Sequence, residues 1–167
     1  MNASTSIACP TGFTVEELRA QIRAEYSRLA QNPDDSFHFH RGVDYAVNHL
    51  KYRRADLEAL PSTTTARFAG VGNTLRVGPI LPGETVLDHA CGAGMDLLLA
   101  ARLVGPRGRC IGVDMTAALR EQASIAAHQA DLTEIVELRS GLLEDLPVET
   151  GSVDVVLSNG VINLSPD

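Results

Sequence analysis

One segment near the middle of the chain decides the fold: residues 84–94 read ETVLDHACGAG. The apolar run in its first half follows a Pro-Gly turn and predicts a strand over residues 84–88. A turn with two glycines comes next, and apolar residues then predict a helix over about residues 95–104. A strand, a glycine-containing turn and a helix in direct succession are typical of the first unit of a parallel α/β sheet.

The same alternation continues toward the end of the chain. Further strands are predicted over residues 109–114, 135–138 and 153–158, and a helix over residues 117–130. The strands are apolar almost throughout, which is expected where helices cover both faces of a parallel sheet. The sequence therefore predicts the α/β class, with a Rossmann-like, doubly wound parallel sheet of which about four strands are visible.

The part of the chain before this alternation is predicted to be different in kind. Residues 1–79 are expected to form an extension of helices and loops, and residues 80–167 the N-terminal part of a Rossmann-like domain. The polar residues 1–12 are expected to be disordered. Thr14 and Glu17 have the spacing of a capping box, which predicts the start of a helix that ends at an Asn-Pro-Asp-Asp breaker.

Composition excludes several classes of protein. The chain has 167 residues, enough for one domain with a short extension. Its formal net charge of −7 repels phosphate backbones, so nucleic acid is not an expected partner. No apolar run approaches the ~20 residues of a membrane span, and the N-terminus lacks the pattern of a signal peptide. A cytoplasmic protein without membrane association is therefore expected.

The cysteines and histidines do not predict a metal centre. The three cysteines are an odd number without Cys-x-x-Cys spacing, which favours neither a disulfide framework nor a zinc site. His38 and His40 would lie on one side of an extended segment, but no third ligand is evident and His49 is a weak candidate. A pair of loop histidines without metal is the preferred interpretation.

The glycine-containing turn predicts a ligand site. Gly92 and Gly94 would let the backbone approach a ligand, and the following helix offers free N–H groups. A dinucleotide site needs a third glycine where this chain has Leu97, so that class of ligand is disfavoured, and no P-loop pattern follows. Asp114 ends the second strand, where a carboxylate can bind ribose hydroxyls; the alternative is that it caps the next helix.

At this point the chain resembles a known family. Residues 86–94, 112–116, 141–147 and 158–164 resemble, in order and spacing, four motifs of class I S-adenosylmethionine-dependent methyltransferases. The variant looks most like the arsenite methyltransferase family, over the N-terminal part of its sequence. The resemblance implies that S-adenosylmethionine is the cofactor and that residues 80–167 bind it.

The resemblance also implies roles for individual residues. Gly92 and Gly94 would let the backbone lie against the methionine moiety, and Asp88 would hold the loop or the amino group. Asp114 would bind the ribose, and Met115 would pack on the adenine. These assignments concern the strand ends and the loops between strands and helices.

Further assignments lie outside the first two motifs, and two positions depart from the family. Leu143 and Glu144 would flank the adenine, and Asn159 would lie near the transferred methyl group. Ala90, a cofactor-loop residue, stands where the family usually has glycine. His89 stands at a usually apolar position, where a buried, hydrogen-bonded histidine is expected.

The acceptor is not identified by the sequence. Arsenite methyltransferases bind trivalent arsenic with thiolates, but the two thiol positions covered by this chain are Val71 and Gly160. Cys91 and Cys110 are expected to be buried structural residues that do not replace them. The resemblance therefore implies a small-molecule methyl acceptor whose chemistry stays open.

Three functional hypotheses follow. The first is an enzyme, or the N-terminal part of one, that transfers the methyl group of S-adenosylmethionine. The second is a truncated or split cofactor-binding chain without independent catalytic activity. It is suggested because the sheet of the methyltransferases that this chain resembles usually has more strands than the four visible here. The third and weakest is a nucleotide-dependent oxidoreductase.

Without further strands, the strand at residues 153–157 would be an apolar edge, which invites aggregation or pairing with another chain.

Overall fold

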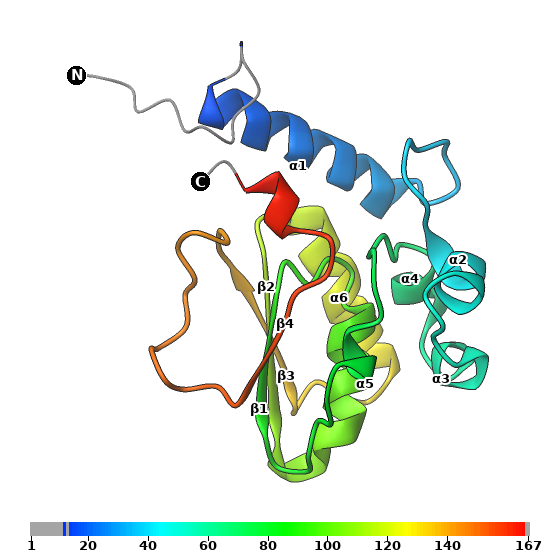
Figure 1. Ribbon diagram of the computed structural model, residues 1–167, viewed down its shortest axis with the longest axis vertical. Coiled ribbons are helices and arrows are strands. Elements are labelled where there is room, and N and C mark those ends of the chain that lie inside the picture. Colours follow the sequence, from blue (N-terminus) through cyan, green and yellow to red (C-terminus); the bar gives the residue numbers. More distant parts are fainter. Residues whose placement is uncertain (1–11, 13, 166–167) are drawn as a thin grey trace.

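The computed structural model describes residue 12 and residues 14–165. The disorder predicted for residues 1–12 therefore lies outside the described residues, apart from Gly12. Within the described part of the chain, a parallel sheet has helices packed on one side and a long loop on the other (Figure 1). A further helix, α1, lies across the upper end of this arrangement in the same view.

The sheet has the strand order β3-β2-β1-β4, and every pairing is parallel. The strands are β1 (Thr85–His89), β2 (Arg109–Asp114), β3 (Val136–Ser140) and β4 (Val155–Leu157). All four predicted strands are confirmed, and so is the α/β class. The fourth is shorter than predicted because only residues 155–157 pair with β1.

Two helices cover one face of the sheet. They are α5 (Met95–Val104), which follows β1, and α6 (Ala117–Gln129), which follows β2. Leu97 and Leu98 of α5 and Ala126 of α6 are completely buried in the main core. Both helices were predicted from the apolar pattern, and their apolar sides fix their orientation on the sheet.

The opposite face of the sheet is covered by a loop, whereas the sequence predicts helices there. The loop between β3 and β4 lies over it (Figure 1). A small apolar cluster there contains Leu87, Ile111 and Val113 of the sheet, with Leu146, Val148 and Val153 of the loop. The expectation of helices on both faces is therefore wrong for the described residues. Gly141, Pro147 and Gly151 interrupt this connection and prevent a helix from forming in it.

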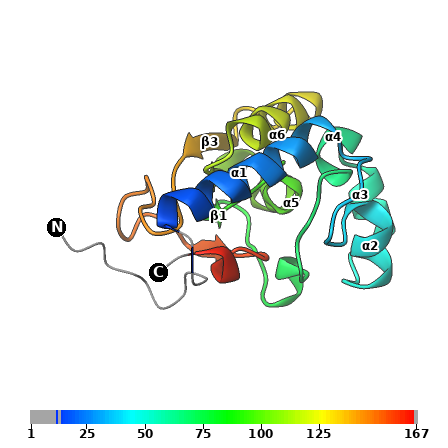
Figure 2. The same cartoon turned by 90° about the horizontal axis from the view of Figure 1, so that it is seen from above.

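In the part of the chain that the structure describes, four α-helices precede the sheet: α1 (Val15–Gln31), α2 (Gly42–Asn48), α3 (Arg54–Glu58) and α4 (Ser62–Thr65). The predicted capping box is confirmed, since the Thr14 side chain accepts from the Glu17 amide and the Glu17 carboxylate accepts from the Thr14 amide. Both α1 and α4 pack against α6, and Figure 2 shows α1 running across the ends of the strands. The extension is thus part of the same body as the sheet.

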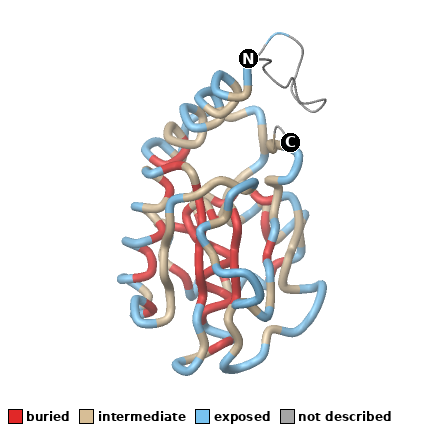
Figure 3. Tube along the Cα trace, turned by 90° about the vertical axis from the view of Figure 1, so that its left-hand side faces the viewer, coloured by how far each residue is buried: buried red, intermediate tan, exposed pale blue. Residues whose placement is uncertain are grey.

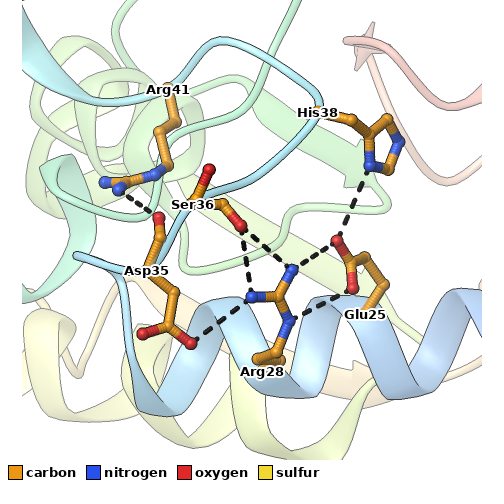
Figure 4. Close-up of polar contacts among 6 residues, drawn as sticks. All are labelled: Glu25, Arg28, Asp35, Ser36, His38 and Arg41. Carbon is orange, nitrogen blue, oxygen red and sulfur yellow. Dashed lines mark hydrogen bonds and ion pairs between the residues drawn. The ribbon is translucent and has the colours of Figure 1, made fainter.

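The loop between α1 and α2 is folded back against α1. Polar contacts among Glu25, Arg28, Asp35, Ser36, His38 and Arg41 hold it there (Figure 4). At their centre the Arg28 guanidinium donates to the Ser36 carbonyl at 3.2 Å. The loop then places the Phe39 ring in a stack on Tyr26 of α1, with 5.7 Å between ring centroids. This contact matters because Tyr26 faces the pocket described below.

Buried residues lie mainly between the sheet and its two covering helices (Figure 3). Cys91 and Cys110 are both free and buried, as predicted, whereas Cys9 lies outside the described residues. Burial raises the pKa of the Cys110 thiol to about 12, so this residue is not a thiolate at neutral pH. No helix in the described part of the chain is long and apolar enough to cross a membrane.

Candidate functional site

A pocket of about 140 Å³ lies at the carboxyl ends of β1 and β2, the usual place for a ligand in an open parallel sheet. Its walls come from the β1–α5 and β2–α6 loops, the segment after β3, the segment after β4, and α1. Eight of the nine predicted site residues line it: Asp88, Ala90, Gly92, Asp114, Met115, Leu143, Glu144 and Asn159. The ninth, Gly94, starts α5 and packs toward Ala123.

The β1–α5 loop is built from left-handed backbone conformations. Ala90, Gly92 and Gly94 have φ values of 67°, 56° and 88°. The amides of Ala90 and Cys91 both donate to the Val113 carbonyl, which ties the loop to β2. The structure thus explains why glycine suits position 90, since a left-handed residue with a side chain costs roughly 1–2 kcal/mol.

The backbone of Gly92 faces open space. A Cβ added there would meet no atom within 4 Å, although Gly92 lines the pocket and the rest of the loop is packed. A ligand can therefore approach the peptide backbone closely at this point. This is the local geometry that a backbone-bound methionine moiety needs, so the loop fits S-adenosylmethionine.

Asp114 connects the two loops of the site. Its Oδ2 accepts from the Gly92 amide at 2.9 Å, and its Oδ1 accepts from the Thr116 amide at 2.8 Å. Thr116 is itself the N-cap of α6. The carboxylate therefore orders the β2–α6 turn and reaches across to the β1–α5 loop instead of capping the helix.

Three buried carboxylates surround one end of the pocket. Asp88, Asp96 and Asp114 are 4%, 5% and 7% exposed, and all three line the pocket. Burial raises the pKa of each, and for Asp88 the charges of the other two raise it further. Arg120 is the cation that lowers the pKa of Asp114, and its guanidinium donates to the backbone carbonyl of that residue. A ligand with positive charge would relieve this excess of buried negative charge.

Helix α1 contributes residues that the sequence analysis did not assign to the site. Arg19, Ile22, Tyr26 and Leu29 line the pocket from above. Burial raises the pKa of the Tyr26 hydroxyl, and the charge of Asp114, which lines the same pocket, raises it further. The apolar spacing of α1 indicated a buried face, but no local pattern distinguishes packing against a ligand pocket from packing against the core.

Glu144 is held at the rim of the pocket by two neighbours. Its Oε1 accepts from the Ser165 hydroxyl at 2.8 Å and lies 3.6 Å from Nη2 of Arg19 on α1. The predicted adenine-flanking segment is thereby connected to both α1 and the segment after β4. Gly141 starts this segment, and a Cβ on it would lie 2.5 Å from Cδ of Pro147.

Asn159 and the two predicted thiol positions lie together. The Asn159 amide contacts the turn that contains Val71, whose own amide donates to Asn159 Oδ1 at 2.8 Å. A Cβ added to Gly160 would lie 3.4 Å from Cγ1 of Val71. Positions 71 and 160 are therefore neighbours beside the pocket, although 89 positions separate them in the sequence.

The histidines singled out in the sequence lie in different surroundings. His89 is buried, as expected, but its Nδ1 has no hydrogen-bond partner among the described residues, so the expected hydrogen bond is not made by this nitrogen. Burial lowers the pKa of His89, which keeps it neutral. His38 lies 3.7 Å from Glu25, and the described residues contain no group of three or more ligands that could hold a metal ion.

Comparison with known proteins identifies the family. Residues 80–167, more than half of the chain, match the family described as Methyltransferase domain. The chain belongs to this methyltransferase domain family. The predicted resemblance to S-adenosylmethionine-dependent methyltransferases is confirmed, and the same match leaves the oxidoreductase hypothesis without support.

Individual relatives agree with the family. An arsenite methyltransferase of Halobacterium salinarum is 48% identical over 100 residues, which are 59% of this chain and 25% of the relative. One from Aquipseudomonas alcaligenes is 42% identical over 112 residues, 62% of this chain and 31% of the relative. This methyltransferase-domain chain therefore spans about a quarter to a third of these relatives.

A solved structure supports the same fold. The arsenic(III) S-adenosylmethionine methyltransferase from Chlamydomonas reinhardtii is 37% identical and superposes with a TM-score of 0.60. The match covers 68% of this chain and 40% of that protein. The predicted Rossmann-like fold is thereby confirmed, and S-adenosylmethionine is the cofactor that the family match supports.

Proposed function

We propose that this chain is the cofactor-binding part of an S-adenosylmethionine-dependent methyltransferase that acts on a small molecule. Residues 80–167 would form the cofactor-binding domain, and residues 1–79 would cover its pocket with α1. The observation that carries this proposal is the group of buried carboxylates, Asp88, Asp96 and Asp114, around a pocket whose loop exposes its backbone. Such a site suits a ligand that is cationic at one end.

Charge distinguishes this ligand from a nucleotide. S-adenosylmethionine carries an ammonium group and a sulfonium centre, and either would be stabilised by the buried carboxylates. The phosphates of a dinucleotide would be repelled by the same groups. Leu97, which stands where a dinucleotide-binding loop has its third glycine, is completely buried in the core and contributes no open backbone.

The chain's own residues would bind and orient the two reactants. Asp88 would hold the ammonium group, Asp114 the ribose, and Met115 and Leu143 the faces of the adenine. When bound, the cofactor supplies a methyl group on a carbon already activated by the sulfonium. The main task left to the protein is alignment of donor and acceptor at about 3 Å in a site from which water is excluded.

The acceptor side of the pocket lacks the thiols expected for arsenic. Val71 and Gly160 occupy those two neighbouring positions, of which only Gly160 lines the pocket, and Phe68, Val161 and Leu164 form an apolar part of its wall. A small-molecule acceptor held by shape and apolar contact fits this surface better than a thiophilic ion does. Asn159, at the edge of the pocket, is our candidate for a residue near the transferred methyl group.

Calorimetric titration with S-adenosylhomocysteine tests the cofactor site. Saturable binding is expected for the wild-type chain, with at least a tenfold loss in Asp114→Asn. Glu121→Gln, on the exposed side of α6, removes a carboxylate outside the pocket and should bind as the wild type does. Absence of binding by a folded wild-type chain would contradict the proposal.

The alternative of a split or truncated cofactor-binding chain makes a different prediction. It requires binding of S-adenosylhomocysteine without methyl transfer to any of a broad panel of small acceptors. Half-exposed Val156 on the open side of β4 marks where a second chain would pair. Mass spectrometry of the native protein decides this, because a longer polypeptide in cells would dismiss the split chain.

A further inference from the structure

A buried polar network joins three segments that are distant in the sequence. Tyr52 lies between α2 and α3, Asp96 in the first turn of α5, and Asn159 just after β4. The Tyr52 hydroxyl donates to Asp96 Oδ1 at 2.7 Å, and Asn159 Nδ2 donates to Asp96 Oδ2 at 2.8 Å. Both oxygens of one buried carboxylate are thus used to connect the N-terminal extension to the sheet.

Asn159 also forms hydrogen bonds with the backbone turn at residues 70–72. Its Oδ1 accepts from the amides of Val71 and Gly72 at 2.8 and 3.0 Å, and its Nδ2 donates to the Gly72 carbonyl at 2.9 Å. Both donors and both acceptor sites of the amide therefore have protein partners. The side chain binds the turn in one orientation, because a rotated amide would lose all these bonds.

Gly70 permits the close approach of this side chain. A Cβ on Gly70 would lie 2.4 Å from Nδ2 of Asn159 and 2.6 Å from Cζ of Phe68. Gly70, Asp96 and Asn159 line the pocket, whereas Tyr52 does not. Gly70 is therefore the residue of the turn that lines the pocket. Tyr52, outside the pocket, also contacts the turn directly, because its hydroxyl lies 3.1 Å from the Gly72 carbonyl.

General stabilisation does not account for this arrangement. A carboxylate in the first turn of a helix gains up to about 1 kcal/mol from the helix dipole at an exposed site, without any need for burial. Asp96 is instead 5% exposed, and burial raises its pKa, so its charge is costly where it lies. Buried polar groups of this kind are better explained by the single geometry that they impose.

We propose that Tyr52 and Asp96 are positioning residues that hold Asn159 and, together with it, fix the turn at residues 70–72, whose Gly70 lines the acceptor side of the pocket. This inference rests on the proposed function for the meaning of the pocket. The network determines the shape of the wall, while cofactor affinity depends mainly on Asp88, Asp114 and the β1–α5 and β2–α6 loops. Asp96, whose two oxygens bind Tyr52 and Asn159, adds only its charge to the cofactor side. Asn159 then acts on the reaction by placing the turn next to the reactants.

Amide hydrogen exchange followed by NMR tests this directly. In Tyr52→Phe and Asn159→Ala, the amides of Val71 and Gly72 should exchange at least tenfold faster, while the core amides of α5 keep their wild-type rates. Tyr45→Phe, in a half-buried tyrosine of α2, is the matched control and should leave both amides protected. Faster exchange throughout the protein would indicate simple loss of stability and overturn the positioning role.

Exchanging the side chains of Asp96 and Asn159 tests whether their pairing protects the turn. Asp96→Asn alone replaces the charge-assisted bond from Asn159 by a weaker neutral one and should loosen the turn, with exchange rates between those of the wild type and Asn159→Ala. The double variant D96N/N159D again pairs an amide with a carboxylate and should restore part of the protection at Val71 and Gly72. No rescue, in a double variant that melts near the wild-type temperature, would contradict the proposed pairing.

Titration of the same variants with S-adenosylhomocysteine separates this inference from the proposed function. Affinity in Tyr52→Phe should stay within about threefold of the wild type. A tenfold loss would show that the network serves the cofactor and would overturn its assignment to the acceptor side. If the wild type binds no S-adenosylhomocysteine, the proposed function fails, whereas the exchange data still test the network.

Discussion

Gly160 lies against the side chain of Val71, and a methyl group added to the glycine would be 3.4 Å from Cγ1 of the valine. Sequence analysis singled out these two positions separately, as places where arsenite methyltransferases have thiols. In the structure the two positions are adjacent, so they form one site. Whether the chain can hold a soft ion such as trivalent arsenic therefore depends on these two neighbouring positions, and neither is occupied by a cysteine.

Installing both thiols should create a site for trivalent arsenic. The V71C/G160C double variant is expected to bind arsenite at least tenfold more tightly than Val71→Cys alone, because two thiolates then reach one ion. Gly160 has a φ of 70°, so the cysteine there should cost roughly 1–2 kcal/mol of stability. Calorimetry with arsenite measures the gain. Equal binding by the single and double variants would show that the positions do not act together.

Replacing Asp88 by Asn should stabilise the fold and weaken ligand binding. Burial raises the pKa of Asp88 well above its ordinary 3.8, so the folded state prefers the protonated form, and ionisation costs stability as the pH rises. The melting temperatures of variant and wild type should agree below about pH 4 and diverge toward neutral pH, by roughly 2–4 °C per kcal/mol. S-adenosylhomocysteine should bind the variant at least tenfold more weakly. An Asp88→Asn variant that is less stable than the wild type at pH 7 would contradict the predicted direction of the effect.

Cofactor binding should weaken in acid. A cationic ligand favours ionised carboxylates, and burial raises the pKa of Asp88 and of Asp114, so protonation begins above the usual range for Asp. Affinity for S-adenosylhomocysteine should therefore fall as the pH drops through that raised range, with protons released on binding within it. Titration in two buffers of different ionisation enthalpy detects the released protons. An affinity independent of pH from 4.5 to 7.5 would argue against cationic recognition.

Glycine at position 90 should relieve strain. Ala90 has a φ of 67°, whose cost of roughly 1–2 kcal/mol exceeds the roughly 0.5–1 kcal/mol entropic penalty of glycine. Ala90→Gly should therefore raise the melting temperature by a few degrees. Ala93→Gly, in the same loop but without a left-handed φ, should lower it. Destabilisation by both changes would show that strain at position 90 is not significant.

Tyr26 should contribute to ligand affinity through its ring. It lines the pocket from α1 and is supported by the stacked ring of Phe39. Tyr26→Ala should weaken binding of S-adenosylhomocysteine about tenfold, since the pocket loses part of its cover, whereas Tyr26→Phe should bind within about threefold of the wild type. Tyr45→Ala controls for loss of a tyrosine outside the pocket. A larger loss in the phenylalanine variant would assign the role to the hydroxyl group.

Much of the fold was predictable because its signals are local. The strands β1 and β2 and the helices α5 and α6 follow from apolar periodicity over adjacent residues. The capping box of Thr14 and Glu17 involves residues three apart. The covering of the second sheet face was mispredicted, because apolar strands indicate only that a face is buried and not what buries it.

The sequence alone determined the β–α alternation, the glycine-containing loop after β1 and the acidic residue at the end of β2, because each depends on a few consecutive residues. Only the tertiary structure decided that Tyr26 covers the pocket, that Val71 meets Gly160, and that Tyr52 reaches Asp96. These contacts join residues 44 or more positions apart in the last two cases. Their geometry depends on how whole helices pack on the sheet, and no local pattern carries that information.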